Sequence, residues 1–190
     1  MLILRMEMFE TEILKAEAPV AELAELRDVA RFGKLCRECP GYAARWCCPP
    51  LTQAELEVAA RNDTLLIVAA KIRPAESGLP LAAADGLILQ ARRMLEPQLL
   101  ATERELGGRA ALFTGRCPHC GDMPCTRPSG APCRHPDLVR PSLEALGYDV
   151  AAIIDRYLGI RMLWGRDGKL PEYLTVVGGI FHGNAQPFRP

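Results

Sequence analysis

The sequence predicts an α/β fold with a small mixed sheet, flanking helices and long cysteine-rich loops. An apolar, partly β-branched run over residues 64–71 predicts a buried strand, and residues 109–114 predict a second one. A long helical pattern lies between them, so these two strands are expected to run parallel. The chain has 190 residues, enough to bury one core, and we predict a single domain over residues 1–190.

The first helices are predicted from apolar periodicity and capping residues. Residues 20–32 place apolar side chains at helical spacing, and Gly33 is expected to end that helix. Thr52 and Glu55 form a capping-box pattern, which predicts a helix running from there to about Ala60.

The long helix is expected to begin at Asp85, to kink near Glu96 because Pro97 follows, and to end at Gly107. Two short helices and a last strand are expected in the C-terminal part, at residues 140–147, 148–158 and 174–181. The paired glycines of that strand predict a bend or bulge.

Composition and charge argue against several classes of protein. The 23 basic and 23 acidic residues cancel, so we expect no nucleic-acid partner. The longest wholly apolar run, residues 65–70, is far shorter than the roughly 20 residues that cross a bilayer, so we expect no membrane segment. The N-terminus lacks the features of a secretion signal, and we therefore place the protein in a reducing cytoplasm.

In that compartment the eight cysteines are expected to be free thiols, and their spacing favours metal binding. Residues 117–136 hold four of them in the order C-x2-C-x4-C-x7-C, among prolines and glycines that disfavour regular structure. A C-x2-C pair directs two sulfurs at one point, and two more sulfurs complete the shell. The expected metal ligands of this segment are Cys117, Cys120, Cys125 and Cys133.

The other cysteine segment, residues 36–50, begins with a C-x2-C pair and ends with two adjacent cysteines and two prolines. The prolines fix the backbone after Cys48, so Cys48 rather than Cys47 is the expected ligand. Three cysteine ligands leave one iron of a cubane cluster without a cysteine. That position is left for Cys47, a residue outside the segment or a substrate. The alternative is that both segments share one centre. The expected ligands here are Cys36, Cys39 and Cys48.

We expect the metal to be iron, in one or two [4Fe-4S] clusters, with structural zinc as the alternative. Four cysteines in one short loop resemble a cluster loop, prolines neighbour several of them, and nearby arginines can stabilise an anionic cluster. Two C-x2-C pairs separated by a long insertion are also typical of a zinc site with four thiolates. His119 and His135 are expected to flank the metal rather than to bind it, and Trp46 to shield a site or pack in the core.

Several of these segments together resemble a known family. They are C-x2-C-x2-Y-x3-W-x-C-P-P from Cys36 to Pro50, G-x-C-x2-C from Gly115, Cys133-Arg-His-Pro136, and R-P-S-x-E-x2-G from Arg140 to Gly147. The combination resembles a bacterial and archaeal family of cysteine-rich predicted metal-binding proteins. The resemblance covers most of the chain, and it implies metal binding without assigning a reaction.

The function that these features favour is electron transfer, or redox support for a partner enzyme. An enzyme that uses an open iron site is a second hypothesis, and a zinc-stabilised interaction module is a third. A redox partner protein is the expected binding partner under the first hypothesis.

Overall fold

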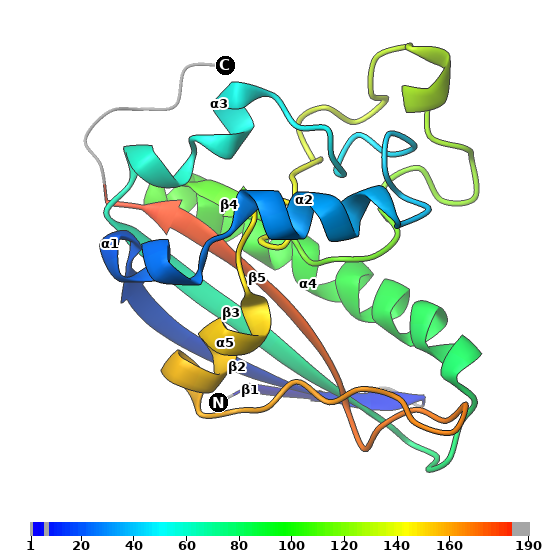
Figure 1. Cartoon of the computed structure of the whole chain (residues 1–190). Coiled ribbons are helices and arrows are strands. Elements are labelled where there is room, and N and C mark those ends of the chain that lie inside the picture. The colour runs from blue at the N-terminus through cyan, green and yellow to red at the C-terminus, as the bar shows by residue number, and fades with distance from the viewer. Residues whose placement is uncertain (1, 6–7, 184–190) are drawn as a thin grey trace.

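An antiparallel sheet forms the centre of the computed structural model, which describes residues 2–5 and 8–183 (Figure 1). Within these residues the sheet has five strands, in the order β1-β2-β3-β5-β4. The strands are β1 (Leu2–Arg5), β2 (Phe9–Pro19), β3 (Thr64–Pro74), β4 (Arg109–Ala111) and β5 (Leu174–His182). The helices are α1 (Val20–Leu23), α2 (Val29–Arg37), α3 (Gln53–Leu56), α4 (Ala84–Leu106) and α5 (Val150–Leu158). Short 3-10 turns lie at Ala24–Leu26, Ala59–Arg61, Leu81–Ala83 and Arg127–Ser129.

Strand β3 lies at the centre of the core, between β2 and β5, and is buried on both faces. Because successive side chains of a strand point to opposite faces, its residues join two separate buried clusters. The two sets are Leu65, Ile67 and Ala69 on one face and Val68, Ala70 and Ile72 on the other. This confirms the buried strand predicted over residues 64–71, which extends to Pro74.

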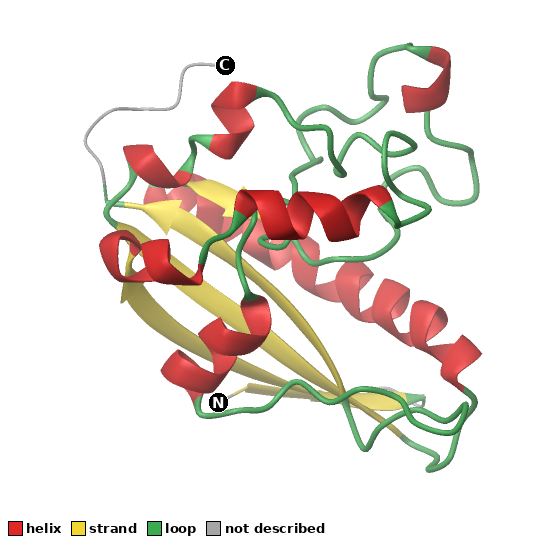
Figure 2. Cartoon of the chain, in the orientation of Figure 1, coloured by secondary structure: helices red, strands yellow, loops and turns green. Residues whose placement is uncertain are grey.

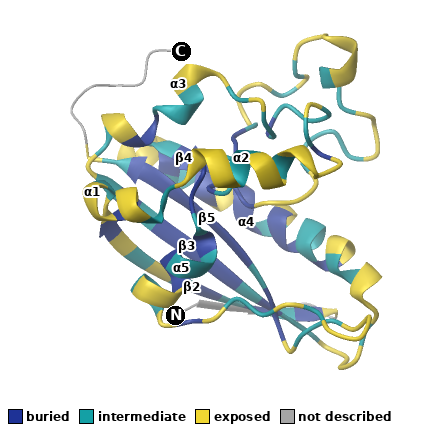
Figure 3. Cartoon of the chain, viewed as in Figure 1, coloured by how far each residue is buried: buried dark blue, intermediate teal, exposed yellow. Residues whose placement is uncertain are grey.

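Helices cover both faces of the sheet and confirm the α/β class (Figures 1 and 2). Helix α4 packs on one face through Leu87, Ala91, Leu95 and Leu99. Helices α1 and α5 pack on the other face through Leu23, Val150, Ile153 and Ile154. Figure 3 shows that the strands and the inner sides of these helices are buried, whereas much of α2 is exposed.

The predicted mixed sheet is wrong in one respect, because every described pair of neighbouring strands is antiparallel. Strands β3 and β4 do run in the same direction, as their connection through α4 predicted. They are not neighbours, however, because β5 lies between them and pairs antiparallel with both. Strands β1 and β2 were not predicted, although β2 alternates buried and less buried residues from Phe9 to Ile13.

The predicted helix over residues 20–32 is interrupted, and Gly33 does not end it. The Asp28 side chain accepts a hydrogen bond from Arg31 N at 2.8 Å and so begins α2 as a separate helix. Helix α2 then passes through Gly33 to Arg37 and carries Cys36 in its last turn. The capping box at Thr52 is confirmed, but α3 ends at Leu56 and is followed by a 3-10 turn.

Strand β5 has no bulge at its paired glycines, contrary to the prediction. Its register with β3 is continuous, with Val68 opposite Gly178 and Ile67 opposite Gly179. The glycines are needed for space instead. A Cβ at Gly178 would lie 2.8 Å from Ala111 O, and one at Gly179 would lie 2.5 Å from Leu66 O.

The end of α4 is tied to the C-terminal part of the chain by a buried ion pair. Glu103 accepts two hydrogen bonds from the Arg140 guanidinium, at 2.8 and 2.9 Å, and a third from Ala110 N at 2.9 Å. Both side chains are buried. The helix predicted over residues 140–147 is not formed, and residues 143–147 make a series of turns instead.

Replacing Glu103 with alanine should lower the free energy of unfolding by about 3–5 kcal/mol, because Arg140 is then left buried without its counter-charge. Urea unfolding followed by circular dichroism measures this. The matched control is Glu105→Ala, an exposed position on the same helix, where a change within about 0.5 kcal/mol is expected. Equal losses at both positions would contradict the assigned role.

Candidate metal centres

The two cysteine segments lie side by side beyond the end of α2 (Figure 1). Each lines a cavity of its own. All eight cysteines are free thiols. We call the cavity lined by Cys36, Cys39, Cys47 and Cys48 the first cavity, and the one lined by Cys117, Cys120, Cys125 and Cys133 the second cavity. The structure thus keeps the two predicted sets of cysteines apart, and their role as metal ligands stays a prediction.

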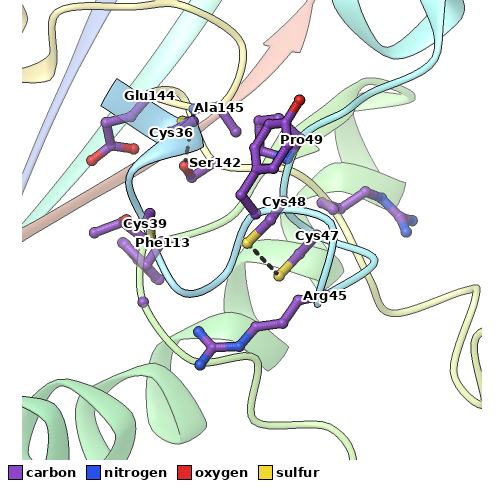
Figure 4. Close-up of a pocket in the computed structure, with 14 residues that line it drawn as sticks. Cys36, Cys39, Arg45, Cys47, Cys48, Pro49, Phe113, Ser142, Glu144 and Ala145 are labelled. Carbon is purple, nitrogen blue, oxygen red and sulfur yellow. Dashed lines mark hydrogen bonds between the residues drawn. The ribbon is translucent and has the colours of Figure 1, made fainter. Parts of the chain in front are cut away.

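The first cavity has a volume of about 150 Å³, and the sulfurs of Cys47 and Cys48 lie next to each other in it (Figure 4). Cys39 N bonds to Cys36 O at 3.1 Å, and Tyr42 N bonds to Cys39 O at 3.0 Å. Gly41 leaves the space that the sulfurs need. A Cβ there would lie 3.0 Å from Cys48 Sγ and 3.6 Å from Cys39 Sγ. These two sulfurs therefore face a common point next to the backbone.

A network of backbone hydrogen bonds fixes the helix that carries Cys36. Asp28 N donates to Gly147 O at 2.8 Å, and Asp149 N donates to Leu26 O at 2.9 Å. Gly147 is required here because its φ is +94° and a Cβ would lie 2.9 Å from Val29 Cα. The turns after Arg140 thus dock the N-terminus of α2 and set where its last turn, with Cys36, lies.

The second cavity has a volume of about 60 Å³ and is lined by all four predicted ligands of its segment. The chain reaches this cavity from the end of β4, and Arg92 of α4 holds its backbone in place there. Arg92 Nη1 donates to Thr114 O at 3.1 Å and to Arg116 O at 2.7 Å, while its Nε donates to Glu96 at 2.6 Å. This buried side chain fixes the backbone immediately before Cys117.

His119 lies beside the second cavity, close to the same ion pair. Its Nε2 is 3.4 Å from Glu96 Oε2, and neither atom has a hydrogen-bond partner among the described residues. Burial and the charge of Arg92 lower the pKa of His119, so its imidazole is neutral at pH 7. Burial raises the pKa of Glu96, although Arg92 opposes the shift. His119 therefore flanks the cysteines as a neutral group.

Arg127 and Trp46 bind the two cysteine segments to each other. The Arg127 guanidinium donates to Arg45 O and Pro50 O, each at 2.6 Å, and to Cys48 O. It also lies over the Trp46 ring, 5.3 Å from its centroid. Trp46 Nε1 in turn donates to Thr126 Oγ1 at 3.1 Å. Trp46 is thus part of the contact between the segments rather than of the main core.

Cys47 lies between the two cavities and contacts both sets of cysteines. Its Sγ is 3.9 Å from Cys48 Sγ, and its thiol lies close enough to Cys117 for each of the two to shift the pKa of the other. Arg45 lines both cavities. The two sites therefore share a wall made of one buried thiol and one guanidinium.

The thiols next to this wall differ in acidity. The bond with Cys117 favours the Cys47 thiolate, but the bond to Cys48 and burial outweigh it and raise the pKa of Cys47 to about 12. The same pairing with Cys47, together with burial, raises the pKa of Cys117. The hydrogen bond from Cys47 lowers the pKa of Cys48 against its burial, and Arg45 adds to the effect. Burial raises the pKa of Cys36 and of Cys133.

The donor set fits a soft metal, because thiolates select zinc and iron–sulfur clusters. In the described residues the Cys, His, Asp and Glu side chains do not converge in groups of three or more around a single metal ion. Two functional features were not found from sequence. Glu144 lines the first cavity, and Arg127 joins segments that are about eighty residues apart. The arginine-to-glycine motif at residues 140–147 was the only signal for Glu144.

Comparison with known proteins places the chain in a family. A family model described as "Predicted metal-binding protein (DUF2284)" matches residues 22–181. The chain therefore belongs to this family, as the resemblance in its cysteine segments implied. Searches of curated proteins and of solved structures gave no match. None of the helices in the described part of the chain is long and apolar enough to cross a membrane.

Replacing Arg127 with lysine should weaken the contact between the segments, because an ammonium group cannot bond to three carbonyls in a planar fork. We expect a loss of about 1–3 kcal/mol in the free energy of unfolding. The fluorescence of Trp46 should also shift to longer wavelength as its ring loses the guanidinium. The control is Arg93→Lys, at an exposed position on α4. A variant that unfolds like the wild type with unchanged fluorescence would contradict this role.

In the metal-free protein, Cys48 should react with iodoacetamide at neutral pH before Cys47 and Cys117, because its pKa is lowered whereas theirs are raised. We expect alkylation at Cys48 to be at least about tenfold faster than at Cys47 or Cys117, as read by peptide mass spectrometry. Cys47→Ala removes the donor that stabilises the Cys48 thiolate, so the reaction at Cys48 should slow. Faster reaction at Cys47 than at Cys48 would show that the order of acidities is wrong.

Proposed function

We propose that this member of the predicted metal-binding family holds two [4Fe-4S] clusters and acts in electron transfer or as a redox accessory to a partner enzyme. The observation that carries the proposal is the pair of adjacent cavities, each lined by one predicted set of cysteines. Cys36, Cys39 and Cys48 would hold one cluster. Cys117, Cys120, Cys125 and Cys133 would hold the other.

Several contacts of the chain support redox chemistry at these sulfurs. Gly41 N donates to Cys39 Sγ and His135 N donates to Cys133 Sγ, each at 3.4 Å. The Arg134 guanidinium lies 4.0 Å from Cys120 Sγ. Hydrogen bonds and positive charge at cluster sulfurs stabilise the reduced, more negative state and raise its potential.

The position of the sulfurs suits exchange of electrons with another protein. Cys39 is exposed, and the other proposed ligands are half-buried rather than deep in the core. When bound, the clusters supply one-electron chemistry. The chain's own contribution is to fix the ligands, to shield the shared wall at Cys47 from water, and to place Arg45 between the two sites. We place this activity in the cytoplasm, where the thiols stay reduced.

An enzyme is the second candidate function, and the first cavity favours it. Three proposed ligands line that cavity together with polar side chains from the 140–147 turns, Ser142 and Glu144. A small substrate could bind there next to a metal with an open position. A zinc-stabilised interaction module remains the third hypothesis, because four thiolates also suit zinc.

Metal and acid-labile sulfide should be measured on protein purified without oxygen. We expect iron and sulfide in equal amounts, about eight of each per chain, and a brown colour. Cys36→Ser with Cys39→Ser should remove about four irons, and Cys120→Ser with Cys125→Ser should remove the other four. Substoichiometric iron with about one or two zinc ions and no sulfide would overturn the redox proposal in favour of the zinc module.

A further inference from the structure

Only three of the four cysteines that line the first cavity are predicted ligands, and a carboxylate lines the same cavity. Glu144 lines this cavity with Cys36, Cys39 and Cys48 (Figure 4). It is close enough to Cys36 for its charge to act on that thiol. Its carboxylate is thus an oxygen donor of the kind that binds zinc and iron in proteins.

The Glu144 carboxylate has a donor atom to spare. Burial raises the pKa of this carboxyl group, and Ser142 and the backbone of Glu144 only partly oppose the shift. Its Oε2 is nevertheless buried and has no hydrogen-bond partner in the described residues. A buried carboxylate oxygen without a partner costs free energy, so its retention calls for a ligand.

Two of the arginines near Glu144, Arg140 and Arg92, are bound to other groups. Arg140 lines the same cavity, but its guanidinium is held by both oxygens of Glu103. Arg92 is likewise held by Glu96 and by two carbonyl groups. Among the described residues, no ion pair is formed by Glu144 itself.

The turn that carries Glu144 is held rigidly by its apolar residues. Leu143 and Leu146 are fully buried in the core cluster under α5. Leu146 N donates to Ser142 O, and Gly147 N donates to Glu144 O. With these leucines pointing inward, the residues between them face the cavity. The buried turn therefore holds the residue that carries this carboxylate at the wall of the cavity.

We propose that Glu144 is the oxygen ligand that completes the metal centre of Cys36, Cys39 and Cys48. This rests on the proposed function, because it requires metal in the first cavity. Cys47, the competing candidate, lines the same cavity with its Sγ 3.9 Å from Cys48 Sγ, and the test below separates the two. A carboxylate is a harder and weaker ligand for cluster iron than a thiolate. The iron bound by Glu144 is accordingly the exchangeable one, and its site is where a small substrate would bind.

The test compares four variants of the full chain, reconstituted with iron and sulfide without oxygen. Glu144→Gln removes the ligand and keeps its shape, and Glu144→Cys supplies a thiolate instead. Cys47→Ser tests the competing ligand, and Glu172→Gln is the control at an exposed acid. Mild ferricyanide takes one electron from a [4Fe-4S] cluster. The oxidised cluster then releases one iron(II) and leaves a [3Fe-4S] cluster, which gives an electron paramagnetic resonance signal.

Glu144→Gln should release this iron at least about tenfold faster than the wild type, and Glu144→Cys at least about tenfold more slowly. Glu172→Gln should match the wild type, and Cys47→Ser should release iron more slowly than Glu144→Gln. Rates within about twofold of the wild type for both Glu144 variants would overturn the assignment and leave the cluster proposal standing. Fast iron release by Cys47→Ser instead of Glu144→Gln would overturn the assignment as well.

Failure of the proposed function would give a different result from failure of the Glu144 assignment. If the chain carries zinc without sulfide, the redox role fails. The rate at which each variant releases zinc to a chelator then tests the ligand assignment, and the variants should fall in the same order. If no metal is bound at the first cavity, both proposals fall. Circular dichroism of the metal-free variants shows whether they fold. A folded Glu144→Gln variant that melts earlier but releases metal like the wild type would assign Glu144 a structural role only.

Discussion

Two buried ion pairs on helix α4 hold the parts of the chain from which both cavities are built. Arg92, paired with Glu96, bonds to the two carbonyls that precede the second cysteine loop. Glu103, two turns further along, holds Arg140 and with it the turns that dock α2 and present Glu144. A buried pair is a costly way to gain stability. The role of each pair here is to hold loop backbone in place. A charged group that forms several hydrogen bonds can do this where the loop has few apolar side chains to pack.

This arrangement explains why sequence predicted the sites better than the sheet. The α/β class, the buried strand at residues 64–74 and the start of the α3 helix follow from local periodicity and capping, which the chain itself displays. The position of β5 between β3 and β4 depends on pairing with residues more than one hundred positions away in β3 and about seventy positions away in β4. The break at Asp28 was also missed, because a capping aspartate inside an apolar periodic run looks like an ordinary exposed residue.

The same distinction holds within the candidate site. The grouping of the cysteines into two sets follows from their spacing, since residues a few positions apart in a turn must share a neighbourhood. The clamp at Arg127 and the entry of Glu144 into the first cavity are contacts between distant segments. No local pattern predicts which of the surrounding arginines will bond to carbonyls and which, like Arg45, will face the sulfurs. Only the folded chain separates these roles.

The two cavities differ in a way that assigns them different work under the proposed function. Four thiolates surround the second cavity, which suits a cluster that only stores and passes an electron. The first is the larger of the two, and Glu144 lines it beside its cysteines. A harder ligand leaves one metal position open to exchange, so chemistry on a bound molecule belongs there. Cys47 lies next to Cys48 of the first site and Cys117 of the second, so a change at this one thiol acts on the cysteines of both proposed centres.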